Sequence, residues 1–217
     1  MQLIIGNRAY SSWSLRGWLA AKHSGLPFDT LVLPMYDANW AQRRTASDLA
    51  PSGGKVPLLW DGDIAAWNGL GIIDHLDRRT GGRHFWPSDA AACSFAASVA
   101  AEMQSSFQAL RSQCSMNVRR HYPGWTVDAD AAADIARIDA LWCHARARFG
   151  GGGRYLFGAW GAADMMFAPV ASRFTTYDVK LSEPAEAYRA AVMAHPHMLE
   201  WIGDAMQESW TLAIYEF

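Results

Sequence analysis

Three serines stand where an apolar run gives way to an amphipathic segment. The run "QLII" is followed by "YSSWSLRGWL" at residues 10–19, and the apolar spacing beyond it predicts a helix over 14–25. A helix N-terminus carries unpaired N–H groups and positive potential. A serine there either caps the helix or donates a hydrogen bond to a bound anion. Ser11, Ser12 and Ser14 are candidates for both roles.

Arg16 falls in the first turn of this predicted helix, where a cation opposes the helix macrodipole. The opposition costs roughly a few tenths of a kcal/mol unless an anion offsets it. Two anions are equally suitable: the carboxylate of a bound ligand, or a buried Asp or Glu of the chain itself.

A second candidate site is the proline that opens the apolar run "KVPLLW" at residues 55–60. Proline is tolerated at the start of a strand, because it removes no interior ladder bond there. Two geometries are open. A trans Val56-Pro57 bond is an ordinary strand edge, whereas a cis bond would expose the Val56 N–H and C=O to a peptide that binds as an added strand.

Short apolar runs and helical patterns alternate in the first half of the chain. The predicted order is strand 2–6, helix 14–25, strand 29–34, strand 55–60, a two-residue turn at Asp61-Gly62, a last strand ending at Trp67, and helix 69–79. This is a βαβ unit followed by a ββα unit.

Strand signals nearly vanish after residue 85. Ser88 or Asp89 caps a predicted long helix that ends near Arg111, Asp128 caps another through Arg148, and a third begins after "YLFGAW". The fold class is therefore α/β plus all-α. We expect a first domain over 1–80, a linker over 81–87 and an all-helical domain over 88–217.

Composition excludes several classes of protein. The 217 residues include 19 basic and 21 acidic ones, for a net charge of -2, and the basic doublets are scattered, so nucleic acid is not an expected partner. No apolar run reaches the roughly 18 residues that span a membrane, and no signal-peptide pattern is present, so we expect a cytoplasmic protein. The three cysteines lack metal-ligand or disulfide spacing, so we expect free thiols and no metal.

The chain resembles the glutathione S-transferase family over essentially its whole length. Four motifs in order carry the resemblance: "YSSWSLR", "PSGGKVPLLWDGD", "NGLGIIDHL" and "YLFGAWGAADMMFAPVASRF". "SSWSLR" looks like the SSCxxR motif of the zeta class, which includes maleylacetoacetate isomerases. The resemblance implies a thioredoxin-like N-terminal domain, glutathione as co-substrate, a small electrophilic substrate and a two-fold homodimer.

By resemblance, Ser11 is the catalytic hydroxyl. A free thiol has a pKa near ~8.5, so a hydrogen-bond donor that favours the thiolate makes glutathione a better nucleophile at neutral pH. Ser12 is its neighbour in the glutathione pocket, Lys55 lies near the glycyl carboxylate, and Val56 meets the cysteinyl backbone. Trp13 stands where the zeta motif has cysteine, so the resemblance does not imply thiol–disulfide exchange at this position.

The chain departs from the family at Asn68-Gly69. Most members have an acidic or amide residue followed by serine there, and this pair holds the γ-glutamyl end of glutathione. Asn68 keeps an amide, and Gly69 keeps its backbone N–H but lacks the hydroxyl. The alternative is that Asn68 only caps the next helix and the tripeptide site has decayed.

The helical half supplies further candidates for contact with the electrophile. Met103, Phe107 and Arg111 are spaced to share a face that meets the other domain in this family; such a stripe is also typical of core. Trp13 and Arg16 are candidates for the same role. "GAADMM" matches the family's structural capping box with Gly161 at the cap, so one of the two reciprocal bonds is lost.

These features favour a glutathione S-transferase whose thiolate attacks an electrophilic carbon, by conjugation or by glutathione-dependent cis–trans isomerisation. A glutathione-dependent lyase is an alternative that the same chemistry permits. A non-catalytic binding protein of this fold is the other alternative, motivated by Gly69 and the weakened caps.

Overall fold

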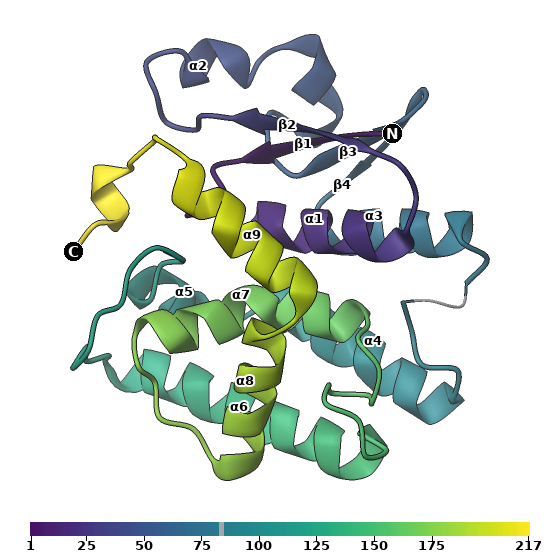
Figure 1. Cartoon of the computed structure of the whole chain (residues 1–217), viewed down its shortest axis with the longest axis vertical. Coiled ribbons are helices and arrows are strands. Elements are labelled where there is room, and N and C mark those ends of the chain that lie inside the picture. Colours follow the sequence, from purple (N-terminus) through teal and green to yellow (C-terminus); the bar gives the residue numbers. More distant parts are fainter. Residues whose placement is uncertain (83–84) are drawn as a thin grey trace.

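The computed structural model describes residues 1–82 and 85–217. The apolar runs of the first half form β1 (Gln2–Gly6), β2 (Asp29–Leu33), β3 (Leu58–Asp61) and β4 (Ile64–Trp67). The sheet order is β2-β1-β3-β4; β2 is parallel to β1, and β3 is antiparallel to both β1 and β4. Helices α1 (Ser12–Ser24) and α3 (Gly69–Arg79) lie on one face, and α2 (Trp40–Arg43) and the 3₁₀ turn η1 (Ser47–Ser52) on the other (Figure 1). This is the predicted thioredoxin-like arrangement.

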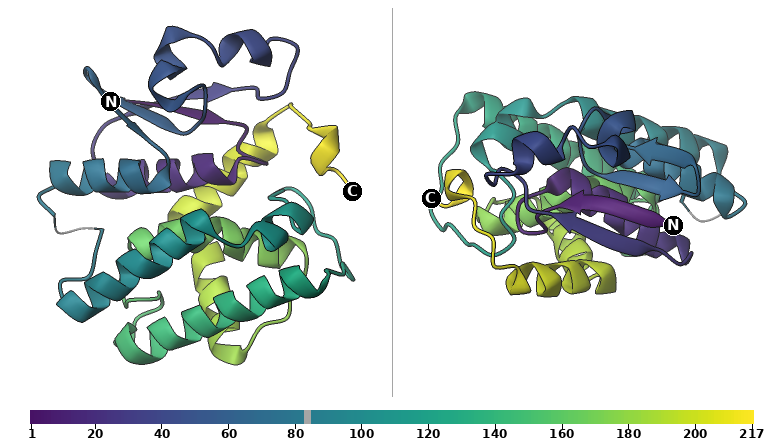
Figure 2. Two further views of the ribbon diagram at one scale, coloured as in Figure 1. Left: turned by 180° about the vertical axis from the view of Figure 1, so that it is seen from behind. Right: turned by 90° about the horizontal axis from the view of Figure 1, so that it is seen from above.

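The second half is helical, as predicted. It contains α4 (Ala90–Ser105), α5 (Gln108–Gln113), α6 (Ala129–Phe149), α7 (Ala162–Thr176), α8 (Glu183–Met193), α9 (Pro196–Gln207) and the 3₁₀ turn η2 (Ala213–Tyr215). Views from behind and from above show α4 to α8 packed below the face of the sheet that α1 and α3 cover (Figure 2). The predicted linker 81–87 includes Arg83 and His84, which lie outside the described residues, so the domain boundaries stay a prediction.

Two local predictions are wrong. The long helix expected to run to about Arg111 breaks after Ser105, because Phe107 adopts a left-handed backbone (φ 63°) and buries its ring in the core. In the hairpin, Asp61 pairs with Ile64, so the two turn residues are Gly62 and Asp63 rather than Asp61 and Gly62.

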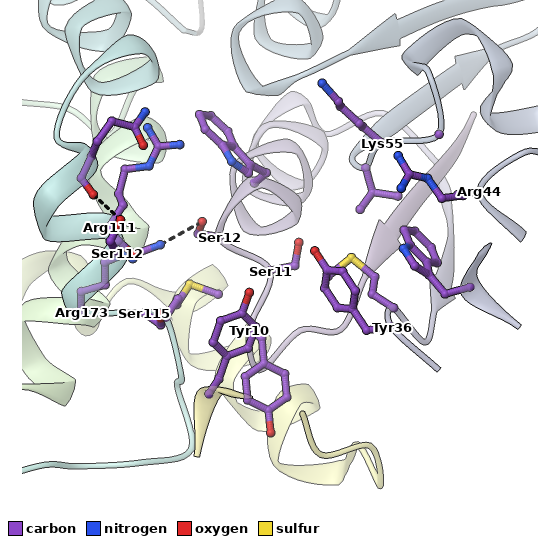
Figure 3. A pocket seen from close by; sticks show the side chains of 18 residues that line it. Tyr10, Ser11, Ser12, Tyr36, Arg44, Lys55, Arg111, Ser112, Ser115 and Arg173 are labelled. Carbon is purple, nitrogen blue, oxygen red and sulfur yellow. Dashed lines mark hydrogen bonds between the residues drawn. The ribbon is translucent and has the colours of Figure 1, made fainter. Parts of the chain in front are cut away.

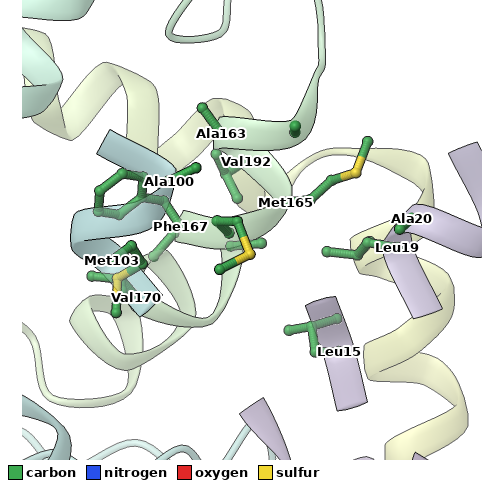
Figure 4. Packing of buried hydrophobic residues seen from close by; sticks show 14 of the residues in the cluster. Leu15, Leu19, Ala20, Ala100, Met103, Ala163, Met165, Phe167, Val170 and Val192 are labelled. Carbon is green, nitrogen blue, oxygen red and sulfur yellow. The ribbon is translucent and has the colours of Figure 1, made fainter. Parts of the chain in front are cut away.

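Helices α1 and α7 pack against each other at the centre of the molecule. Figure 4 shows Leu15 and Leu19 of α1 near Met165 of α7, all fully buried. On its other side α1 approaches the loop before β3: a Cβ at Gly17 would lie 2.8 Å from Pro57. The start of α1 is therefore held between both halves of the chain.

Asp164 fixes the start of α7. Its carboxylate accepts hydrogen bonds from the Gly161 N–H (2.9 Å), the Leu156 N–H (3.1 Å) and the Tyr188 hydroxyl (3.0 Å). Gly161 has no side chain to return a bond, as predicted. Burial raises the pKa of Asp164 to about 7. The capping carboxylate thus joins α7, α8 and the loop before α7.

Candidate functional site

The loop between β1 and α1 presents the serines. Asn7 anchors this loop from a fully buried position: its side-chain oxygen accepts from the Met35 N–H (2.9 Å), and its backbone carbonyl accepts from the Ser11 N–H (2.9 Å). Ser11 is the N-cap of α1, which begins at Ser12, two residues earlier than the predicted helix. The loop after the carboxyl end of β1 thus places the Ser11 and Ser12 hydroxyls at the N-terminus of α1.

The two serines make different hydrogen bonds. The Ser11 hydroxyl donates to Ser14 Oγ (2.8 Å) and accepts weakly from the Ser14 N–H (3.4 Å). The Ser12 oxygen accepts from the guanidinium of Arg173 (3.1 Å). Both serines are 8% exposed, and both line the same cavity. Ser11 therefore caps the helix and also faces a cavity; the hydrogen bond from Ser11 to a bound anion stays a prediction.

This large cavity, of about 500 Å³, lies between the two halves of the chain. Arg111 and Arg173 of the helical half lie on one side of the serines in Figure 3, and Arg44 and Lys55 of the first half lie on the other. Its walls also include Tyr10, Trp13, Tyr36, Trp40 and Tyr215, and none of the described residues that line it is acidic. A cavity with four cationic side chains and no carboxylate is suited to an anion.

Acidic side chains of the described residues do not neutralise these four cations. None of the ion pairs among residues 1–82 and 85–217 involves Arg44, Lys55, Arg111 or Arg173. Burial, with a contribution from neighbouring Arg111, lowers the pKa of Arg173 to about 10. Because like charges close together raise the free energy of the empty site, a bound anion would relieve this repulsion.

Trp13 separates the large cavity from a smaller one of about 310 Å³. The predicted glutathione residues divide between the two: Ser11 and Ser12 line the large cavity, Asn68 lines the small one, and Lys55 and Val56 line both. A tripeptide that touches all of them must extend past Trp13 along residues 55–56.

The backbone at residue 56 is suited to pairing with such a peptide. The Val56-Pro57 bond is cis, the second of the two geometries considered from the sequence. Ser52 Oγ holds the preceding residue by accepting from the Lys55 N–H (3.1 Å) and donating to the Lys55 carbonyl (2.6 Å). Within the described parts of the chain, the Val56 N–H and C=O form no hydrogen bond. They remain available to a ligand.

Among the described residues, no Asp or Glu side chain pairs with Arg16, so the internal carboxylate that was one of its two expected partners is not found. It is 2% exposed, and its guanidinium donates to the carbonyls of Met166 (2.9 Å) and Ser12 (3.3 Å). It also lies over the Trp13 ring, 4.5 Å from the centroid, where the Arg111 guanidinium lies at 4.9 Å. Burial, with Arg173 and Arg111 nearby, lowers the Arg16 pKa well below its ordinary value. Arg16 thus supports Trp13 and adds positive charge, but it does not line the cavity.

Two predicted substrate residues belong to the core. Met103 is fully buried and Phe107 is 4% exposed, and neither lines a cavity near the serines. Of that stripe, only Arg111 reaches the large cavity. The sequence prediction missed Arg44, Arg173 and the tyrosines. The available signal was Arg173, the basic residue of α7, in a helix whose other charged residue is the capping Asp164.

Asn68 and Gly69, the pair predicted to hold the γ-glutamyl end of glutathione, differ in their surroundings. The Asn68 side chain accepts from the Gly71 N–H (2.9 Å), so it caps α3; it also lines the small cavity, and its contact with glutathione stays a prediction. Gly69 is buried and lines neither cavity. A Cβ at Gly69 would lie 3.0 Å from Met166 Sδ and 3.2 Å from Arg16 Cβ. Close packing against Met166 of α7 and Arg16 of α1 explains why this position lacks a side chain.

We therefore expect Gly69→Ala and Gly71→Ala to change stability in opposite directions. At Gly69 the added methyl must displace Met166 or Arg16, which costs about 1–3 kcal/mol. At Gly71 the nearest atom to the added methyl is Asn68 Oδ1 at 3.6 Å, so the lower entropy of the unfolded chain should give a gain of about 0.5–1 kcal/mol. Urea denaturation of the two variants measures both effects. Equal stability of the two would contradict the packing argument.

Among the described residues, no group of three or more His, Cys, Asp and Glu side chains could hold a metal ion, and no helix is long and apolar enough to cross a membrane. The three cysteines are free.

Comparisons with known proteins identify the fold. Residues 10–79 match the family model described as the N-terminal domain of glutathione S-transferase. A glutathione transferase homolog from Burkholderia with bound glutathione superposes with a TM-score of 0.71 at 16% identity, covering 95% of this chain and 98% of that one. Maleyl pyruvate isomerase, a bacterial zeta-class glutathione S-transferase, gives 0.72 at 19% identity, with coverage of 97% and 100%.

A theta-class enzyme from Xanthomonas axonopodis with glutathione bound gives a TM-score of 0.65 at 18% identity, covering 93% of this chain and 96% of that one. No curated protein sequence matches the chain. The fold is that of the glutathione S-transferases.

Proposed function

We propose that the protein is a glutathione S-transferase in which Ser11 stabilises the glutathione thiolate for attack on a small, anionic electrophile. The observation that carries the proposal is the large cavity, where two serine hydroxyls at a helix N-terminus face four cationic side chains; among the described residues these cations form no ion pair, and no acidic side chain lines the cavity. The family match over residues 10–79 supports glutathione as the thiol. The solved relatives with bound glutathione support it as well.

The proposed chemistry begins with ionisation of the thiol. The proton leaves to solvent, and the thiolate accepts a hydrogen bond from the Ser11 hydroxyl, which exchanges Ser14 for the sulfur. The N-terminus of α1 and the nearby guanidinium groups favour the same anion. The thiolate then attacks an electrophilic carbon: departure of a leaving group gives a thioether, whereas rotation and loss of the thiolate complete a cis–trans isomerisation.

We further propose that the electrophile carries a carboxylate. Arg111 and Arg44 reach the cavity from opposite sides of the serines, so a carboxylate is attracted wherever the electrophile lies. Arginine is the residue best suited to carboxylates because its planar guanidinium offers paired donors. The zeta-class similarity to maleyl pyruvate isomerase supports an isomerase-like, glutathione-dependent reaction.

The test compares an unsaturated carboxylic acid with its methyl ester as electrophile, in the presence of glutathione. We expect the acid to have the higher kcat/KM, and Arg111→Gln to lower the kcat/KM of the acid about 10- to 150-fold while changing that of the ester less than twofold, since a charged hydrogen bond contributes roughly 1.5–3 kcal/mol. Equal effects of the substitution on acid and ester would exclude a carboxylate partner for Arg111. Maleylacetone consumption tests isomerisation separately.

One observation favours a second function, that of a glutathione-binding protein without catalysis. Asn68 caps α3, and Gly69 is packed out of both cavities, so the γ-glutamyl end has fewer partners than the resemblance implies. Retention on immobilised glutathione without turnover of any electrophile would support this function over the enzyme.

We also propose a zeta-like, cytoplasmic homodimer. The Ser11-Ser12 motif supports the subtype, and the free cysteines fit a reducing compartment. Ile64 and Trp67, 53% and 46% exposed on the edge strand β4, support a dimer contact there. Sedimentation analysis tests the oligomeric state.

A further inference from the structure

The guanidinium of Arg173 is held at three points. One terminal nitrogen donates to the carbonyls of Cys114 (2.6 Å) and Arg111 (3.2 Å), and the other donates to Ser12 Oγ (3.1 Å). The residue is only 6% exposed, and its carbonyl partners belong to the segment that carries α5. A planar group fixed in this way cannot rotate away from Ser12.

This contact determines what the Ser12 hydroxyl can do. Arginine only donates hydrogen bonds, so the Ser12 oxygen must be the acceptor, and the Ser12 hydrogen must point elsewhere. Within the part of the chain that the structure describes, the Ser12 hydroxyl donates to no protein group. The Ser11 hydroxyl, by contrast, already donates to Ser14 Oγ (2.8 Å). Of the two serines at the start of α1, Ser12 is thus the one whose hydrogen is free for a ligand.

We propose that Arg173 is a positioning residue that holds Ser12 as a second hydrogen-bond donor to the glutathione thiolate. This inference rests on the proposed function and extends it. A hydroxyl that accepts a charge-assisted hydrogen bond becomes a stronger donor, because the two bonds polarise each other. Ser12 keeps its own proton throughout: the thiol proton leaves to solvent, and the thiolate accepts the Ser12 and Ser11 hydrogen bonds.

The experiment measures the pKa of enzyme-bound glutathione from the ultraviolet absorbance of the thiolate as a function of pH. Ser12→Ala and Arg173→Gln should each raise this pKa by about one unit, a tenfold loss of thiolate below the pKa. Arg173→Lys should raise it nearly as much, because lysine keeps the charge but lacks the planar fork that grips three acceptors. Arg111→Gln is the matched control: it removes one positive charge from the same cavity without touching Ser12.

A double-mutant cycle separates the hydrogen bond from the charge. With Ser12→Ala already present, Arg173→Gln should raise the thiol pKa no further than Arg111→Gln does. Additive effects of Ser12→Ala and Arg173→Gln would overturn the proposal, as would a Ser12→Ala enzyme whose bound thiol has the wild-type pKa. If Arg173→Gln fails to fold, Arg173→Lys and Ser12→Ala complete the cycle.

The same titration distinguishes this inference from the proposed function. A wild-type protein that binds no glutathione, or leaves the thiol pKa at its free value, would refute both. A wild-type protein that lowers the thiol pKa through Ser11 alone would refute only the role of Ser12 and Arg173.

Discussion

Ser11→Ala is expected to lower kcat for glutathione conjugation by about 10²- to 10³-fold, the effect of removing one preorganised donor from a developing or bound anion. The hydroxyl lies at the N-cap of α1 and faces the large cavity, so its loss raises the pKa of the bound thiol. The pH profile of kcat/KM should shift to higher pH, with activity recovered in part as the solution becomes more alkaline. Steady-state kinetics across pH measure both effects.

Stability must be measured alongside, because Ser11 also caps the helix. Loss of the cap costs about 1 kcal/mol, which leaves the protein folded if its stability is ordinary. Ser11→Thr keeps a hydroxyl and a cap, and should recover most of the rate. Ser98→Ala removes a hydroxyl from the exposed face of α4 and is the control: its kcat and its stability should stay close to those of the wild type. If the Ser11→Ala enzyme kept the wild-type kcat at neutral pH, a hydrogen-bond donor other than Ser11 would have to stabilise the thiolate.

Asp164→Ala is expected to lower the free energy of unfolding by roughly 4 kcal/mol. The substitution leaves the Leu156 N–H, the Gly161 N–H and the Tyr188 hydroxyl without their acceptor, each at about 1–3 kcal/mol when buried. Water that enters the resulting cavity should accept hydrogen bonds from some of these donors. The loss of unfolding free energy should therefore be smaller than the sum of the three individual costs. Chemical denaturation measures the difference. Asp130→Ala, an exposed acid near the start of α6, should cost far less.

The Asp164 effect should also depend on pH. The folded protein holds the Asp164 proton more tightly than the unfolded chain, because burial raises the pKa from 3.8 to about 7. The stabilisation that Asp164 contributes is therefore fully present below its pKa in the unfolded chain, and it is lost as pH rises through about 7. The gap in unfolding free energy between wild type and Asp164→Ala should narrow from about pH 5 to about pH 8. A gap that widens over this range would contradict the raised pKa.

Local patterns predicted most of the fold. The strands, α3 and the start of α6 follow from short apolar runs, a helical period and the cap at Asp128, whose side chain accepts from the Ala131 N–H (3.0 Å). The break before α5 was missed because residues 106–111 are compatible with a helix locally. Burial of the Phe107 ring, a tertiary effect, ends α4 instead.

The site was less predictable, because its contacts join residues far apart in the chain. Ser12 and Arg173 are 161 residues apart, and Arg16 and Met166 are 150 apart. A lone arginine in an apolar helix gives no periodic signal, and the sequence could only suggest an anion near Arg16. Gly69 was interpreted as a lost hydroxyl, whereas the structure gives a steric reason for the glycine. Its roles in glutathione binding, like those of the other predicted site residues, remain predictions.

The hydrogen bond from α7 to the start of α1 has a consequence for how such chains diversify. One half carries the serines and the other supplies the arginine that orients one of them, so a chimera joining residues 1–80 to a foreign helical half without an arginine at position 173 would lose the Ser12 contact even if both parts folded. Substitutions in the wall of the large cavity around Arg111 could change which electrophile the enzyme accepts. If the whole helical half were exchanged, the new half would need an arginine at position 173 to keep the contact with Ser12.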